Sequence, residues 1–182
     1  MKINGPKLKK MSEAKGLSVE QLAQAVERTG LSGGRAVSAV GNWMRGSDHP
    51  RCKREDIVAL AGALGCEVAE IASFTSVFKY HRGSPRKAKL LVDLIRGKDY
   101  DTAVNLLKFT TRRAALDIQK ALFAAWDDAQ RAGCERPEAM YVTQSMVGDA
   151  PRMKRFQPKD RGRAHPIIKR MTHITIGLEE RK

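Results

Sequence analysis

This sequence of 182 residues lacks the features that mark membrane and secreted proteins. It has no apolar run of about 18 residues, the length that a membrane-spanning helix needs. Its first ten residues, MKINGPKLKK, also lack the apolar core of a secretory signal. We therefore expect a cytoplasmic protein without a membrane span. The hydrophobic fraction of 42% is sufficient for one medium domain or two small ones.

Cysteine is scarce, and its placement argues against structural roles for the thiols. Cys52, Cys66 and Cys134 are odd in number and far apart in the sequence. This usage favours isolated reduced thiols over a disulfide framework. The spacing of His49, Cys52 and Cys66 has a weak likeness to a zinc site, but CxxC pairs and a fourth ligand are missing. We expect no metal and no other cofactor.

Catalytic patterns are missing as well. The glycines of SGG at 32–34 are too few for a phosphate-binding loop and open no strand-helix unit. Asp127 and Asp128 are neighbours on a predicted helix, about 100° apart, which is typical of a solvated face. No histidine has an adjacent Cys, Ser or carboxylate pair in a nucleophile-base-orienter pattern: His49, His81, His165, His173. We therefore expect no enzymatic activity.

Positive charge is the abundant feature. Thirty-four Lys and Arg residues against twenty Asp and Glu give a net charge of +14 and a pI near 10.1. The excess lies mainly in the second part of the chain, because residues 1–76 have a net charge of +3 and residues 77–182 a net charge of +11. Such a balance favours a polyanionic partner, nucleic acid first and an anionic membrane surface second.

The first 73 residues predict a run of short helices. Ser18 is placed to cap a helix that buries Leu22, Ala23 and Val26 and that Gly30 closes. A second helix is expected in RAVSAVGNWMRG, residues 35–46, with Gly46 as its end. A third is expected from about Arg54 to Leu64, followed by a final turn of helix in EVAEIASF.

This region resembles the Cro/C1-type helix-turn-helix domain. The resemblance rests on LSVEQLAQAV, on the Trp and Gly of NWMRG, and on IVALAGALGCEVAEI. It implies that the helix containing NWMRG enters the major groove of DNA. The side chains that would contact nucleic acid are Arg35, Ser38, Asn42 and Arg45. A small helical bundle that serves as an accessory domain, in contact with RNA or protein, is the alternative, and the glycines of SGGRAVSAVGN favour it.

From residue 74 the pattern changes to a second domain, residues 74–182. FTSVFKYHRG predicts a short strand at 74–83, and Ser84 and Pro85 then begin a helix that Gly97 ends. Another helix is expected from about Asp99, and then a long third helix that Thr110 or Thr111 caps and Gly133 ends. These helices are expected to bury the following side chains: Ala88, Leu91, Val92, Ile95, Ala103, Leu106, Leu107, Ala115, Ile118, Leu122, Ala125 and Ala129.

Two segments with a period of two predict antiparallel strands around a long hairpin. Met140, Val142 and Met146 are expected on one face of the first strand, and Ile174, Ile176 and Leu178 share a face of the second. Between them, at about 146–172, lies a cationic arm whose PKDRGR sequence supplies a reversal at Asp160 to Gly162. The fold class is α+β: three helices on a small antiparallel sheet with a protruding β-hairpin, preceded by an all-α domain.

The arm requires a partner outside the chain. An isolated two-stranded ribbon is only marginally stable in water, and clustered cations repel one another. RNA or DNA phosphates would stabilise it, since each cation placed on a phosphate releases counterions. A flexible basic tail is the alternative, and the strand patterns at both ends of the arm argue against it.

Residues 77–182 resemble the bacterial large-subunit ribosomal protein twenty-two family. The resemblance rests on SPRKAKLLVDLIRGK, residues 84–98, and on RMKRFQPKDRGRAHPIIKRMTHITI, residues 152–176. It implies a structural constituent of the large ribosomal subunit that binds 23S rRNA, aids assembly and lines the polypeptide exit tunnel with its hairpin. The partners implied are large-subunit rRNA, neighbouring ribosomal proteins and the nascent peptide.

The resemblance also implies site residues. Those expected to bind rRNA are Ser84, Arg86, Lys87, Lys89, Arg152, Lys154, Arg155, Lys159, Arg161, Arg163, Lys169, Arg170 and His173. Those expected in the tunnel-lining hairpin are Met153, Lys154, Arg155, Phe156, Lys159, Arg161, Gly162 and Arg163. The tip departs from the family pattern at Asp160, which could pair with a flanking arginine, and at His165 and Pro166. A DNA-binding transcription regulator led by the N-terminal helices is the alternative function.

Overall fold

The computed structural model describes residues 1–28 and 30–181, which form two compact units. Unit 1 contains Met1–Phe74 together with Asp128–Glu135. Unit 2 contains Thr75–Asp127 and the chain from Arg136 onward. The described helices include none that is long and apolar enough to cross a membrane.

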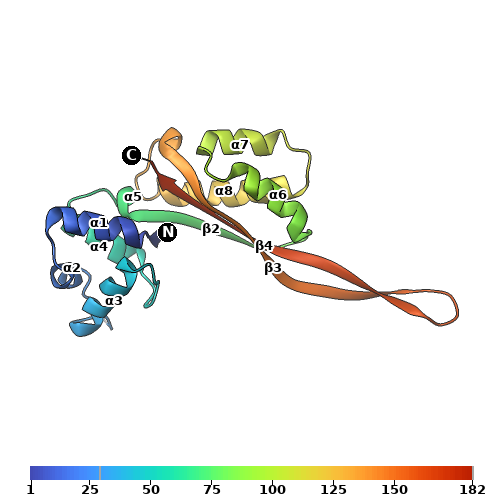
Figure 1. Ribbon diagram of the computed structural model, residues 1–182, viewed down its shortest axis with the longest axis horizontal. Helices are drawn as coiled ribbons and strands as arrows, with labels where there is room; N and C mark the ends of the chain where they lie inside the picture. Colours follow the sequence, from blue (N-terminus) through green and yellow to red (C-terminus); the bar gives the residue numbers. More distant parts are fainter. Residues whose placement is uncertain (29, 182) are drawn as a thin grey trace. The chain divides into compact units, whose positions relative to one another are not determined.

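Unit 1 is mainly helical, as the sequence predicts. A two-residue strand, β1 (Lys2–Ile3), pairs antiparallel with Ala72 and Ser73 at the start of β2 (Ala72–His81). The sequence pattern did not identify β1 or the first helix. The helices, labelled in Figure 1, are α1 (Gly5–Lys15), α2 (Val19–Ala25), α3 (Gly34–Met44), α4 (Arg54–Leu64) and α5 (Val68–Ile71).

The start of α2 is confirmed and its end is not. The Ser18 hydroxyl accepts from the Gln21 N–H at 3.3 Å, and the Gln21 side chain accepts from the Ser18 N–H at 2.9 Å. This reciprocal arrangement is a capping box. The prediction that Gly30 closes the helix is wrong, because α2 ends at Ala25. Arg28 and Leu31 instead exchange two backbone hydrogen bonds of 3.0 and 2.8 Å, which turn the chain before α3.

An ion pair inside unit 1 connects the α2–α3 turn to α4. The Arg28 guanidinium donates to the Asp56 carboxylate through Nε at 2.9 Å and through Nη2 at 3.2 Å. The same carboxylate accepts from the backbone N–H of Lys53 at 2.8 Å, so it also caps the start of α4. Asp56 is buried in a core that includes Trp43 and Ile57. A charge at this depth depends on its partners.

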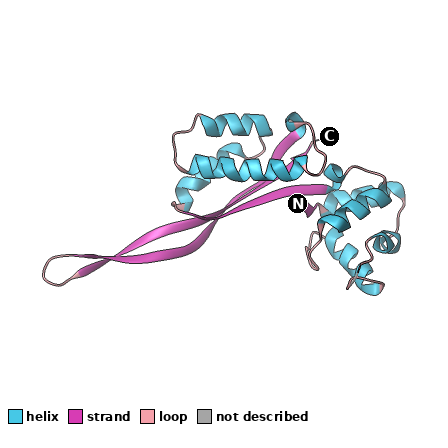
Figure 2. Ribbon diagram, turned by 180° about the vertical axis from the view of Figure 1, so that it is seen from behind, coloured by secondary structure: helices cyan, strands magenta, loops and turns pink. Residues whose placement is uncertain are grey.

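Unit 2 combines three helices with the long strands of the sheet. The strand order is β1-β2-β4-β3, and β3 and β4 are antiparallel. Figure 2 shows the helices gathered beside the start of β3 and the end of β4, while the tip of the hairpin extends beyond them. The elements are α6 (Pro85–Ile95), α7 (Tyr100–Lys108), α8 (Ala114–Gln130), a short 3-10 helix (Pro137–Ala139), β3 (Met140–Pro158) and β4 (Ala164–Glu180).

Most of the residues predicted to face the core of unit 2 from its helices are buried. All four inward residues of α6 and all five of α8 are buried. In α7 Ala103 and Leu107 are buried, but Val104 is buried in place of Leu106, which is half-buried. The Thr110 hydroxyl donates to the Leu106 carbonyl at 2.7 Å, so it satisfies the end of α7 and does not cap α8.

A β-bulge overturns one expected strand face. Met140 and Val142 are buried as predicted, but Met146 is 52% exposed. Val142 pairs with Leu178 and Gln144 with Gly177, so Thr143 is an extra residue that reverses the alternation. Ser145 is buried instead, donating to the Val92 carbonyl at 3.0 Å. Ile174, Ile176 and Leu178 of β4 are fully buried, as expected.

Removing the Asp56 carboxylate should destabilise unit 1. Asp56→Ala leaves Arg28 without its buried partner and α4 without its cap, so we expect a loss of about 3 kcal/mol in the free energy of unfolding. Urea unfolding followed by the fluorescence of buried Trp43, in a Trp126→Phe background, measures it. Exposed Glu55 on the same turn is the matched control, and Glu55→Ala should change stability by less than about 0.5 kcal/mol. Equal effects would contradict the structural role of the pair.

Candidate nucleic-acid interface

The hairpin of β3 and β4 has two halves that are separated by a second bulge. Ala150 pairs with Met171, and the next pair is Met153 with Lys169, so Pro151 and Arg152 stand opposite Arg170 alone. A proline has no N–H to donate to a ladder and is tolerated at bulges. Beyond this point six residue pairs continue to Pro158 and Ala164. We call residues 151–170 the distal hairpin; Figure 1 shows it in orange and red beyond the helices of unit 2.

Neither face of the distal hairpin is covered. Paired residues share a face, and neighbours alternate between faces. Every residue from Pro151 to Arg170 is exposed except half-buried Met153, and Phe156 is 76% exposed. One face carries Met153, Arg155, Gln157, His165, Ile167 and Lys169. The other carries Lys154, Phe156, Pro158, Ala164, Pro166 and Ile168. The distal hairpin therefore has no core on either side.

Most cations of the distal hairpin have no acidic partner. The exception is Arg152, whose Nη2 lies 3.4 Å from Asp149 Oδ2 between two exposed side chains. Within the residues that the structure describes, no ion pair forms at Lys154, Arg155, Lys159, Arg161, Arg163, Lys169 or Arg170. Asp160 likewise has no ion pair there, so the suggested pairing with a flanking arginine does not form. Exposed, unpaired cations are available to an anionic partner.

The tip reverses where the sequence predicts. The Lys159 N–H donates to the Arg163 carbonyl at 2.7 Å, and the Arg163 N–H donates to the Asp160 carbonyl at 3.2 Å. Between them, Arg161 has φ 53° and Gly162 has φ 70°. Two consecutive positive φ angles characterise the tight turns that join twisted strands. The turn holds the tip cations on a short, defined loop.

His173 lies at the root of the hairpin. Its Nδ1 accepts from the Tyr80 N–H at 3.2 Å, and the two rings meet edge to face with centroids 4.9 Å apart. The half-buried imidazole therefore connects β4 to β2 and lies outside the distal hairpin. Only its remaining ring nitrogen is left for an outside partner.

The predicted cations of α6 form a separate group at the start of that helix. Arg86, Lys87 and Lys89 are exposed, and Ser84 occupies the N-cap position without a side-chain hydrogen bond to the helix. Ser84 and Lys87 line a pocket with three further cations that no sequence motif marks: Arg82, Arg112 and Arg113. In the sequence, two of these cations are visible only as an RR pair before α8. Hydrophobic periodicity does not show that such a pair lines a pocket.

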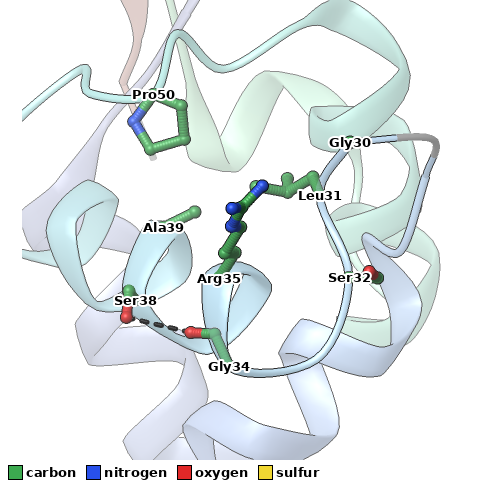
Figure 3. Close-up of a pocket in the computed structure, with 8 residues that line it drawn as sticks. All are labelled: Gly30, Leu31, Ser32, Gly34, Arg35, Ser38, Ala39 and Pro50. Atoms are coloured by element: carbon green, nitrogen blue, oxygen red, sulfur yellow. Dashed lines mark hydrogen bonds between the residues drawn. The ribbon is translucent and has the colours of Figure 1, made fainter.

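The predicted contacts of the N-terminal unit are mostly occupied within α3 and the following loop. The Ser38 hydroxyl donates to the Gly34 carbonyl at 2.9 Å (Figure 3). Asn42 donates to the His49 carbonyl at 2.9 Å, and Arg45 donates to Asn42 Oδ1 at 2.7 Å. Arg35 lines an open hollow of about 780 Å³ whose other lining residues are Gly30, Leu31, Ser32, Gly34, Ser38, Ala39 and Pro50.

The residues with a weak likeness to a zinc site do not form one. In the described ranges no three His, Cys, Asp or Glu side chains are grouped to hold a metal ion. Burial raises the pKa of the Cys52 thiol to about 12, and the carboxylates of Asp56 and Asp48 add to the effect. Because the thiolate is the metal ligand, this environment disfavours metal binding at Cys52.

Comparison with known proteins agrees with this geometry. The family model of ribosomal protein L22p/L17e matches residues 76–179. The chain belongs to this family. The large ribosomal subunit protein uL22 of Streptococcus pyogenes serotype M6 is 41% identical over 115 residues, which are 63% of this chain and 100% of the relative. The family match begins at residue 76, so the helices of the N-terminal unit lie outside it.

The Cys52 thiol should react slowly. In a Cys66→Ser/Cys134→Ser variant, the raised pKa keeps Cys52 protonated, so its thiolate fraction at pH 8 is about a thousandfold below that of a thiol with the ordinary value of 9.0. Alkylation by iodoacetamide should keep accelerating beyond pH 10 in the folded protein, but level off above about pH 10 in urea, where the thiol has its ordinary pKa of 9.0. A folded protein whose rate levels off below pH 9 would contradict this.

Proposed function

We propose that this protein is a structural constituent of the large ribosomal subunit that inserts its distal hairpin into 23S rRNA, aids subunit assembly and lines the polypeptide exit tunnel with the hairpin. It performs no chemical reaction. The observation that carries the proposal is the distal hairpin itself: a paired ribbon, exposed on both faces, with eight cations and one acid between Arg152 and Arg170. Family membership supports the role in the large subunit.

RNA provides what the distal hairpin lacks. Phosphates neutralise the cations and release counterions, which makes insertion favourable and dependent on salt. An extended ribbon cannot read bases in the deep, narrow major groove of RNA helices, so it acts through shape, phosphates and 2′-hydroxyl groups. The exposed Phe156 ring is large enough to stack on an unpaired base.

The strand register divides the proposed tunnel residues between two faces. Met153 and Arg155 lie on one face, whereas Lys154 and Phe156 lie on the other. A ribbon between rRNA and the tunnel lumen presents one face to each. We infer that the residues of one face contact rRNA while those of the other face the nascent peptide. The tip, with Lys159, Arg161, Gly162 and Arg163, is accessible from both sides.

For the N-terminal unit we infer an accessory role in place of DNA recognition. A helix-turn-helix reader needs free side chains on the helix that enters the groove. Of the four predicted contact residues, which lie on α3 and at its C-cap, three are engaged within the unit, which leaves Arg35. A neighbouring ribosomal protein or RNA is the partner we propose for this unit.

Neutralising the tip should weaken RNA binding. For Arg161→Gln/Arg163→Gln we expect affinity for 23S rRNA to fall about 10- to 100-fold, because two phosphate contacts are lost. The slope of log affinity against log salt concentration should become shallower by about 2. Filter binding at several salt concentrations measures both.

The matched control removes two cations elsewhere in unit 2. Lys98→Gln/Arg136→Gln lowers the net charge by the same amount at exposed positions outside the hairpin. Its effect on affinity and slope should be much smaller. Unchanged affinity and slope in the tip variant would contradict the proposed function.

A further inference from the structure

The start of β3 is covered on its outer edge by the segment that precedes α7. The Val142 N–H donates to the Lys98 carbonyl, and the Gly97 N–H donates to the Val142 carbonyl, both at 2.9 Å. Asp99 also forms an isolated bridge with Tyr141. Proteins commonly cover strand edges in this way, because an edge presents a row of unpaired N–H and C=O groups. The fold therefore protects this side of the sheet by itself.

The outer edge of β2 is open over most of its length. β2 lies between β1 and β4, and β1 is so short that it pairs with Ala72 and Ser73 alone. Among the residues that the structure describes, no further strand or loop pairs with this edge at 75–79. Tyr80 ends the edge, because its φ of 60° interrupts the extended backbone and its N–H donates to the His173 imidazole. The open stretch is about 17 Å long at about 3.4 Å per residue, and it is a template for another strand.

The side chains of β2 alternate between a covered face and an exposed face. Phe74 is fully buried, whereas Val77 is 48% exposed and Lys79 is exposed as well. Val77 and Lys79 are two residues apart in an extended strand, so they lie on the same face. Within the described part of the chain, Lys79 has no ion pair. The open edge is thus accompanied by one apolar and one cationic side chain that the protein does not use.

The main-chain groups of this edge fit a protein segment better than RNA. Residues of an edge strand that point outward present both their N–H and their C=O groups, so donors and acceptors are equal in number. Phosphate oxygens only accept hydrogen bonds, whereas an extended peptide offers donors and acceptors at the matching spacing. A second copy of this chain is disfavoured, because residues 77–182 carry a net charge of +11 and two copies repel each other. The cation at Lys79 favours an acidic segment.

We propose that the outer edge of β2, at residues 75–79, binds an extended acidic segment of another protein of the large subunit by β-strand addition. Main-chain hydrogen bonds hold the segment to the edge. On the exposed face an apolar side chain of the segment packs beside Val77, and a carboxylate two residues away pairs with Lys79. The inference rests on the proposed function, since it places the partner in the large ribosomal subunit.

Photo-crosslinking in purified large subunits tests this proposal. The photoreactive residue p-benzoylphenylalanine replaces Val77 or Thr75 in the full chain, and cosedimentation checks that each variant enters the subunit. With the probe at 77 we expect a cross-link to a carboxylate-containing segment of another protein, resistant to RNase and located by mass spectrometry. Moving the probe to 75 should move the cross-linked residue by two positions, because paired strands keep their register. A cross-link to RNA alone, to a second copy of this chain, or to a position that does not move would overturn the inference.

Reversing the charge at position 79 tests the acidic character of the partner. In the chain with the probe at 77, Lys79→Glu should lower the cross-link yield about fivefold, because it places like charges opposite each other across the two strands. Lys79→Arg should keep the yield. Lys98→Glu makes the same charge change at an exposed position away from β2 and is the matched control. Equal yields in Lys79→Glu and Lys98→Glu would contradict an acidic partner at this edge.

Probes in the distal hairpin separate this inference from the proposed function. Arg155 and Phe156 lie on opposite faces of the hairpin, so p-benzoylphenylalanine at one of these positions at least should cross-link to 23S rRNA. If it does, and the probe at 77 forms no cross-link to another protein, the inference alone is wrong. If the chain does not enter large subunits, or neither hairpin probe reaches rRNA, the proposed function is wrong and the inference with it.

Discussion

The absence of a core on either face of the distal hairpin is the constraint on which the rest of this structure depends. Six residue pairs hold a ribbon in which Pro158 and Pro166 cannot donate to the ladder and most of the eight cations have no acid nearby. Backbone hydrogen bonds alone leave such a ribbon marginally stable in water, and charge repulsion lowers its stability further. Its partner must therefore be large enough to cover it and negatively charged. Folded RNA meets both requirements.

The proximal half of the hairpin explains how this arm is held. Ile174, Ile176 and Leu178 are buried, and the bulge at Thr143 turns Ser145 inward. There Arg96 donates to the Ser145 hydroxyl at 3.1 Å and to its carbonyl at 2.8 Å. The strands are thus fixed to α6 at the root and uncovered beyond Ala150.

Much of unit 2 was predictable because its local signals agree with its packing. Leu91 and Ile95 repeat at helical spacing, Pro85 and Gly97 bound α6, and the PKDRGR turn reverses the chain. The register was not predictable, because one extra residue in a bulge reverses every side chain that follows, as Met146 and Ser145 show. The pocket was not predictable either, since Arg82 and Arg112 are 30 residues apart in the sequence and line it together only in the folded unit. In unit 1 the sequence at 35–46 predicted the helix α3, but it did not predict that the Asn42 and Arg45 side chains bond within their own unit.

Hydrogen exchange at the amides of the hairpin, followed by NMR or mass spectrometry, tests most directly whether RNA stabilises the distal half. In the free protein we expect amides of residues 151–170 to exchange rapidly, whereas those near Ile174 and Ile176 exchange slowly. With 23S rRNA bound, the distal amides should become strongly protected while the proximal ones change little. Distal amides that are already protected in the free protein, or that stay unprotected in the complex, would contradict the account.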